Sequence, residues 1–469
     1  MKKTGLIAIA LALGIAGSQV PRFLHAGIAT AQSAAPAEQS LADLADQAIN
    51  ADSAISKPAI DKLRAAGTAG LDALMNANKD QINIHRSGVI VFGVNKADDR
   101  WPRITTALDA VAAQHDAYAS GLYWYTDLAA AETAAKASGK PILSLRLLGN
   151  LSDEYSCANS RFFRTVLYAN TEVSKHLREN YILHWQSVRP VPVITIDFGD
   201  GRKIRRTITG NSIHYVLTAD GTVVDAIPGL YGPKAFLREL SEAVATFDSL
   251  KDQAPPSQAA LLERYHSDQA IAIDRDYRDD LSRAGIRISS MQVQRSKQGS
   301  ESAPPTAAAA VPLTATKARV ERTVVAALSP DASISAQITD ADWQRIAALH
   351  ADDATLDPGS HALMEAKTID AVQAAKRAMS KSIVEDPLVK TVANFQRSIA
   401  EDTVRNEYLY HLQIHRWLAD PATTNLANDV NVLNKRVYAE LFLTPDNDPW
   451  LGLVPKDTYT ALDGGGVCH

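Results

Sequence analysis

The sequence predicts a mixed α/β central domain flanked by a helical N-terminal segment and an all-α C-terminal domain. Three observations lead to this prediction. An apolar strand pattern at residues 142–148 precedes a helix pattern that opens at Cys157. Two pairs of short strand patterns flank glycine-containing turns at 199–201 and 219–221, as in β-hairpins. Apolar residues in both flanking regions recur with a helical period. A chain of 469 residues is also too long for one ordinary hydrophobic core, so we expect several domains.

The first 31 residues have the features of a secretory signal peptide. Lys2 and Lys3 precede an apolar run at residues 6–16, and small residues at 29–31 provide a cleavage site. The apolar run is shorter than the roughly 20 residues that a membrane-spanning helix needs. We therefore expect a periplasmic or extracellular protein with no stable membrane insertion after cleavage. An uncleaved anchor is the alternative.

The charge of the chain disfavours nucleic acid as a partner. The formal net charge is −5, and removing residues 1–31 takes away three basic and no acidic side chains, which gives −8. An acidic protein is repelled by nucleic acid and by anionic membrane surfaces.

Residues 32–122 are predicted to form the helical N-terminal segment. Between residues 40 and 80 apolar side chains recur at helical spacing, and Pro58 stands where a second helix could start. Residues 101–118 carry the pattern of another amphipathic helix. The segment at 63–74 resembles one HEAT-type helical pair, but a single repeat does not make an array.

Residues 123–250 are predicted to form the α/β domain. The pattern gives a helix that Gly139 can terminate, followed by alternating strands and helices and a closing helix. In chain order the predicted elements are a helix at 126–138, a strand at 142–148, helices at 161–168 and 172–180, a strand at 181–188, hairpins at 193–209 and 213–227, and a helix at 233–247.

The rest of the chain is predicted to be a linker and a helical domain. Residues 251–317 are rich in proline, serine and alanine in places, and we assign them to a partly disordered linker with a candidate helix at 258–281. Residues 318–469 form the C-terminal helical domain, which ends in a flexible glycine-rich tail. Its best helix patterns lie at 342–350, 362–382, 388–400 and 402–417.

Several motifs of the central domain occur together in one known superfamily. The chain has Gly-Lys-Pro at 139–141 before the strand, a Cys-x-x-Ser motif at 157–160, Asn-Thr-Glu-Val at 170–173 and Asn-Tyr-Ile at 180–182. In these motifs and their spacing residues 123–250 resemble the thioredoxin-like domains of secreted bacterial proteins. The resemblance implies a thioredoxin-like fold in which the cysteine is the attacking thiol.

The sequence also departs from that family. Ser160 stands in place of the second cysteine, Ser156 replaces the usual tryptophan, and Ser212 occupies the position of the cis-proline. A hairpin at 191–209 is predicted where a helix is usual. The resemblance implies substrate contacts at Ser212 and Ile213. Losing both the second thiol and the proline argues against ordinary dithiol turnover.

Cys157 and Cys468 are the only cysteines. A helix N-terminus favours the thiolate of Cys157, whereas Asp153 and Glu154 oppose it. Without a thiol at Ser160, the remaining chemistry is a mixed disulfide, isomerisation, or resolution by Cys468. The leading hypothesis is therefore monothiol thiol–disulfide handling, by an oxidoreductase or isomerase acting on protein thiols. The alternatives are an inactive thioredoxin-like platform that binds an envelope protein, and an unpaired Cys468 on a frayed tail.

No cofactor is predicted, and the signal for metal is weak. Glu407, His411 and His415 share one helix face, and two histidines four residues apart can hold zinc. The glutamate that follows the first histidine in metalloprotease motifs is missing, so ordinary structural histidines are the favoured interpretation. A third ligand would have to come from His350, His361 or His469.

Overall fold

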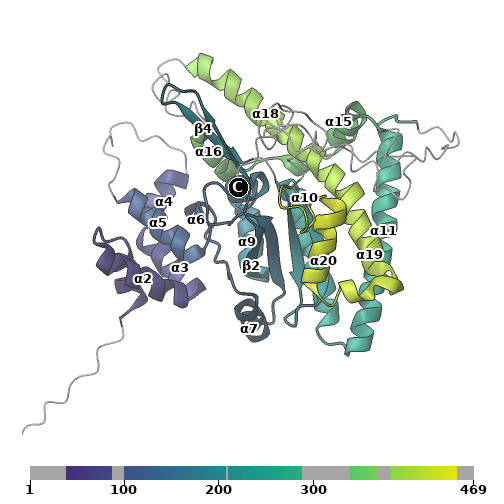
Figure 1. Ribbon diagram of the computed structural model, residues 1–469, viewed down its shortest axis with the longest axis horizontal. Coiled ribbons are helices and arrows are strands. Elements are labelled where there is room, and N and C mark those ends of the chain that lie inside the picture. Colours follow the sequence, from purple (N-terminus) through teal and green to yellow (C-terminus); the bar gives the residue numbers. More distant parts are fainter. Residues whose placement is uncertain (1–38, 87–99, 208–209, 288–337, 368–380, 452–469) are drawn as a thin grey trace, which may run out of the picture. The chain divides into compact units, whose positions relative to one another are not determined.

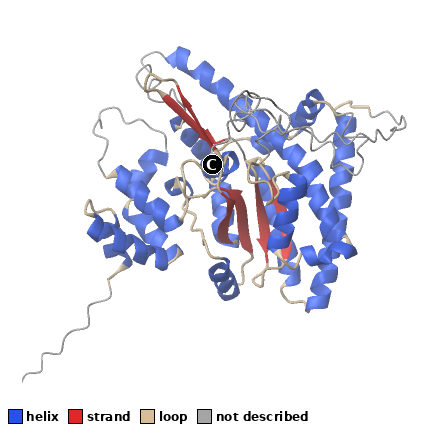
Figure 2. Cartoon of the chain, viewed as in Figure 1, coloured by secondary structure: helices blue, strands red, loops and turns tan. Residues whose placement is uncertain are grey.

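A computed structural model describes the chain in five stretches, and all of the described helices and strands belong to one unit within residues 40–469. The protein is a mixed α/β protein with a four-stranded mixed sheet, a separate hairpin and many helices (Figures 1 and 2). The predicted signal peptide at 1–31 and Cys468 lie outside the described residues. Those residues are 39–86, 100–207, 210–287, 338–367 and 381–451.

Short helices make up the N-terminal segment, as the periodicity predicts, and they bury a core of their own. Leu63, Leu71, Leu74 and Leu108 are almost completely buried in this core. Gly70 allows two of the helices to touch, because a Cβ there would lie 2.0 Å from the Leu63 carbonyl oxygen. The helices are α1 (Leu41–Ala48), α2 (Ser53–Ala65), α3 (Thr68–Ala77), α4 (Lys79–Arg86), α5 (Trp101–Ala112) and α6 (Ala117–Ser120).

The four-stranded sheet has the order β2-β1-β5-β6. The central strand β1 runs parallel to β2 and antiparallel to β5, and β5 runs antiparallel to β6. Every residue of β1 is buried, which explains its nearly continuous apolar sequence. All four strands lie where the sequence predicts them: β1 (Ile142–Leu148), β2 (Ile182–Arg189), β5 (Ser212–Leu217) and β6 (Val223–Pro228).

The helices next to the sheet also confirm the sequence patterns. Gly139 terminates α7 with a φ of +69°, and the Asn170 side chain caps α9 by accepting two backbone N–H groups. The helix predicted at 161–168 consists of a short α-helix that continues as a π-helical turn. The elements are α7 (Leu128–Ser138), α8 (Ala158–Phe162), the π-helical Phe163–Leu167, α9 (Thr171–Asn180) and α10 (Pro233–Leu250).

The predicted hairpin at 193–209 is present as β3 (Val193–Asp197) and β4 (Lys203–Thr207). Its two strands pair only with each other, so the hairpin is a two-stranded sheet of its own (Figure 1). Most of its residues are exposed, but Thr207 at its base is buried. The base of the hairpin therefore reaches the interior near the end of β1.

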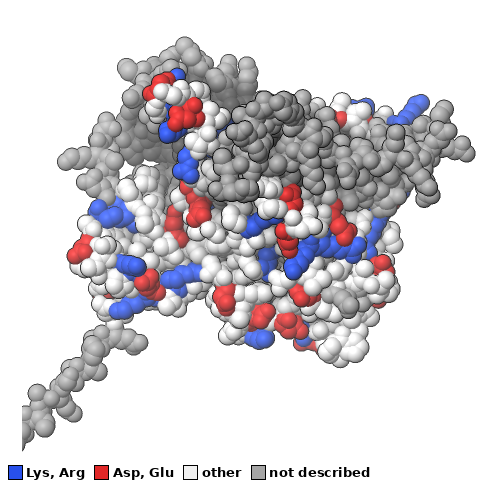
Figure 3. Space-filling model, in the orientation of Figure 1, with Lys and Arg blue, Asp and Glu red and all other residues white. Residues whose placement is uncertain are grey.

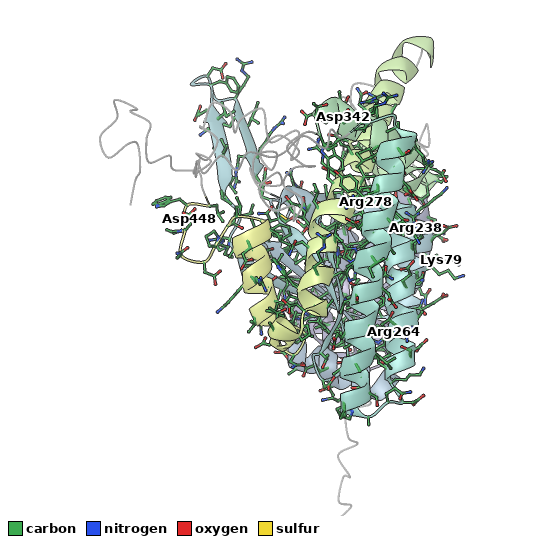
Figure 4. All side chains as sticks on the ribbon, turned by 90° about the vertical axis from the view of Figure 1, so that its right-hand side faces the viewer. Lys79, Arg238, Arg264, Arg278, Asp342 and Asp448 are labelled. Carbon is green, nitrogen blue, oxygen red and sulfur yellow. The ribbon has the colours of Figure 1, made fainter. Side chains whose placement is uncertain are left out.

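The C-terminal half adds helices that share one hydrophobic core with the sheet. The first of them, α11 (Pro255–Arg283), lies in the stretch that the sequence assigns to a linker, and it includes the candidate helix at 258–281. Figure 4 shows α11 between α10 and α19, with Arg264 in its first half and Arg278 in its second. The others are α15 (Asp340–Leu349), α16 (Pro358–Ala366), α18 (Lys381–Arg405), the π-helical Asn406–His411, α19 (Leu412–Ala419), α20 (Val430–Arg436) and the π-helical Val437–Leu441, with short 3₁₀ turns at Ala351–Ala354 and Pro421–Leu426.

Within the described ranges, no helix is both long and apolar enough to cross a bilayer. Acidic and basic side chains are interspersed over the described part of the face shown in Figure 3.

Candidate functional site

Cys157 lies where the sequence predicts it, at the N-terminus of the helix that follows the central strand. It is the N-cap of α8, and its Sγ accepts a hydrogen bond from the Ser160 backbone N–H at 3.5 Å. The Ser160 hydroxyl donates to the Cys157 carbonyl oxygen at 2.9 Å. The serine in the second-cysteine position therefore completes the helix cap and leaves its hydroxyl turned to the backbone.

The two residues that the resemblance implies for substrate contact lie close to this motif. The Asn159 side chain donates to the Ser212 hydroxyl at 2.8 Å, which ties α8 to the start of β5. Ile213 follows in β5 and pairs with Arg146 of β1. Cys157, Ser160, Ser212 and Ile213 have no exposed surface. Of the predicted site residues, the four that the structure describes lie on or beside α8 and β5 and are all enclosed.

One cover over this site comes from the C-terminal part of the chain. Tyr438 is buried, and its hydroxyl donates to the Asn211 carbonyl oxygen at 3.2 Å. Burial, and next the electrostatic influence of Cys157, raise the pKa of Tyr438 well above its usual value. The Asn211 amide donates in turn to the Phe442 carbonyl oxygen and to the Thr444 hydroxyl.

Arg189 fixes the loop that follows. It stands at the end of β2, next to β1, and its guanidinium donates to the backbone carbonyls of Thr444, Pro445 and Asp448. A single half-buried cation thus binds three carbonyls of the segment at residues 444–448.

A second cover is the base of the β3–β4 hairpin. The Thr207 hydroxyl donates to the Ser156 carbonyl oxygen at 3.2 Å and accepts from Arg161 at 2.9 Å. Further out, the Arg205 guanidinium lies 4.4 Å from the centre of the Tyr155 ring. The residues on both sides of Cys157 are therefore held by the hairpin.

A histidine from the N-terminal segment compensates part of the negative charge of the loop before Cys157. His115 lies 2.8 Å from Asp109 through Nδ1 and 2.7 Å from Glu154 through Nε2. Hydrogen bonds to Asp109 and Glu154 raise the pKa of His115 to about 9, and the bond to His115 lowers the pKa of Glu154 to about 2. The charge of Glu154 is therefore paired, which weakens the opposition to a thiolate that the sequence alone suggests.

A second candidate site lies on the outer strand β6, beneath the C-terminal helices. Three histidines and three carboxylates from five elements meet there and form two groups of three. Within each group, one ligand atom of every residue lies within 4.8 Å of the other two. We call these six residues the His–carboxylate cluster. One group is Asp225, His266 and His415, and the other is Glu239, Glu407 and His411.

His411 connects the two groups. Its Nδ1 lies 2.9 Å from Glu407 and its Nε2 lies 3.2 Å from Asp225. Burial lowers the pKa of His411, but the two carboxylates outweigh this and raise it well above the usual value. His411 thus lies between two carboxylates that favour its protonated form.

The other two histidines face each other. His266 Nδ1 and His415 Nδ1 are 2.9 Å apart, and His415 Nε2 lies 3.8 Å from Asp225. Burial lowers the pKa of both rings, so they are neutral near pH 7. Two tyrosine hydroxyls hold the carboxylates, because Tyr265 donates to Asp225 at 2.7 Å and Tyr231 donates to Glu407 at 2.8 Å.

The sequence identifies half of this cluster. Glu407, His411 and His415 do share one face, but the proposed third ligand His350 instead contacts Asp280 and Asp353. His361 is not part of the cluster, and His469 lies outside the described residues.

The partners that the sequence does not reveal are Asp225, Glu239 and His266. Among these three, only Asp225 could have been noticed in the sequence. It is a carboxylate inside an apolar strand, and a buried carboxylate requires a buried partner.

No protein-family model, curated protein or solved structure matches the chain.

Proposed function

We propose that the protein is a thioredoxin-like protein of the cell envelope that serves as a binding scaffold and does not catalyse thiol–disulfide exchange. The strand order β2-β1-β5-β6 supports the thioredoxin-like assignment, together with the parallel β1–β2 pair and the cysteine that caps the helix after β1. The envelope location rests on the predicted signal peptide, and a mature N-terminus at Gln32 would support it.

The observation that carries this proposal is the complete burial of Cys157. A thiolate must reach a disulfide sulfur in line to exchange with it. Here the chain's own segment around Tyr438 and Phe442 bonds to Asn211, next to the position that a substrate would contact. The groove that a partner's disulfide would enter is filled by the C-terminal part of the same molecule.

Monothiol handling is the second candidate, and one observation favours it. The Sγ of Cys157 accepts the Ser160 backbone N–H at the N-terminus of α8, the place where the resemblance puts the attacking thiol. The two candidates differ in whether the covers open under native conditions.

Thiol labelling separates them. In a Cys468→Ser background Cys157 is the only thiol, and its reaction with a small disulfide reagent is followed in native buffer and in denaturant. We expect slow native labelling, full labelling after unfolding, and no trapped mixed disulfide in cells. Tyr438→Phe keeps the ring and should stay protected, whereas Tyr438→Ala should label faster.

Native labelling at the rate of the unfolded chain, or a mixed disulfide through Cys157, would overturn the scaffold proposal. Leu63→Ala provides the matched control, because it weakens the separate N-terminal core. If Leu63→Ala accelerates labelling as much as Tyr438→Ala, exposure occurs by global unfolding and not by lifting the cover.

A further inference from the structure

The His–carboxylate cluster carries an inference that is independent of the thiol. We propose that Asp225, His266 and His415 bind one divalent transition-metal ion of the zinc type. The remaining three residues of the cluster then orient these ligands.

The donor set suits such an ion. Two imidazoles and one carboxylate are a common three-residue ligand set for zinc and for iron(II). Magnesium and calcium prefer oxygen ligands, and two nitrogens among three donors disfavour them. Soft copper(I) is disfavoured because no sulfur belongs to either group among the described residues.

The donors lie near the spacing that coordination needs. Ligands about 2.0–2.2 Å from a metal lie about 2.9–3.6 Å from one another at octahedral or tetrahedral angles. One ligand atom from each of Asp225, His266 and His415 lies within 4.8 Å of the other two, and the Nδ1 atoms of the two histidines are 2.9 Å apart. Metal binding would therefore require the side chains to turn so that one donor of each approaches a common point.

A hydrogen-bonded network alone does not account for this arrangement. A proton shared between His266 Nδ1 and His415 Nδ1 satisfies one nitrogen of each ring. His266 Nε2 is then left without a partner among the described residues, on a side chain with no exposed surface. Buried polar atoms are normally paired, so an unpartnered imidazole nitrogen on a ring that contacts a second histidine supports a ligand site.

The surrounding residues hold the carboxylate ligand from both sides. Tyr265 donates to Asp225 Oδ2, and the His411 ring contacts Oδ1. His411 in turn contacts Glu407, which accepts from Tyr231. Such outer hydrogen bonds fix ligand orientation in metal sites. The metal would fasten α11 and α19 to β6, and its complete enclosure gives it a structural role.

Metal content tests the proposal. The exported full chain carrying Cys468→Ser is purified from zinc-supplemented medium, dialysed against metal-free buffer, and measured by mass spectrometry. We expect about one zinc per chain, lost in His266→Gln and in His415→Gln. His350→Gln is the matched control, because His350 also contacts two carboxylates but has no second histidine beside it in the described contacts.

A wild-type chain without zinc, or equal loss in His350→Gln, would overturn the proposal. X-ray absorption on the zinc-loaded chain gives a second measurement that does not depend on the folding of a variant. We expect only nitrogen and oxygen neighbours with two imidazoles, and a sulfur neighbour or a single imidazole would contradict the assignment. Neither readout depends on the reactivity of Cys157, so failure here leaves the scaffold proposal intact.

Discussion

Replacing His115 by glutamine should change the pH dependence of stability in a direction that the structure fixes. His115 bridges Asp109 and Glu154, and these bonds raise its pKa from 6.5 to about 9. The folded state therefore binds this proton more tightly than the unfolded state does. The stabilisation is complete below pH 6.5 and is lost as the pH rises through 9.

The magnitude follows from the same shift. At about 1.4 kcal/mol per pKa unit, a rise from 6.5 to about 9 corresponds to an upper limit of about 3 kcal/mol. The Glu154 side chain is 57% exposed, so solvent screens its bond to His115. We therefore expect about 1–2 kcal/mol. The pKa of Glu154 is lowered to about 2, so its own contribution is present above pH 4.5 and is lost on acidification toward pH 2.

Urea unfolding of the wild type and His115→Gln at pH 5.5, 7.5 and 9.5 checks this prediction. The free energy of unfolding of the wild type should exceed that of the variant most at pH 5.5, and the difference should shrink steadily toward pH 9.5. His350 also has a raised pKa, so only the difference between the two proteins isolates His115. A difference that stays constant over this range would refute the reasoning.

Three further substitutions test the packing around the sites. Gly232→Ala places a Cβ 2.2 Å from the Asp353 carbonyl oxygen, so we expect a loss of more than about 2 kcal/mol in thermal unfolding. Asn159→Ala removes the buried bond to the start of β5 and should cost about 1–3 kcal/mol, measured by urea unfolding. Arg189→Ala releases residues 444–448, which should become cleavable in limited proteolysis while circular dichroism stays unchanged.

Local patterns in the sequence were sufficient to predict the elements of the sheet and most helices. The apolar run of β1, the glycine turn after α7 and the two hairpin turns each encode their structure within a few residues. The helix at 258–281 was also visible as a pattern, but its packing was not. A polar surface pattern does not reveal that α11 lies against α19.

The sites were harder to predict because they depend on contacts between distant residues. Tyr438 bonds to Asn211 from 227 residues away, so no local pattern indicates that Cys157 is covered. His266 and His415 come from helices 149 residues apart in sequence. The sequence shows which side chains are available for a site, whereas burial and partners are decided by tertiary packing.

The enclosed thiol and the polar cluster have one physical cause in common. Asn211, just before β5, and Asp225, in β6, are buried polar residues. C-terminal residues complete their hydrogen bonds, Tyr438 for Asn211 and His411 for Asp225. Pulling the C-terminal helices away would leave both residues without these partners, and each unpaired buried group costs about 1–3 kcal/mol or more when charged. Uncovering Cys157 is therefore coupled to the same packing that holds the cluster, which favours a closed scaffold over a thiol that opens and closes in each catalytic cycle.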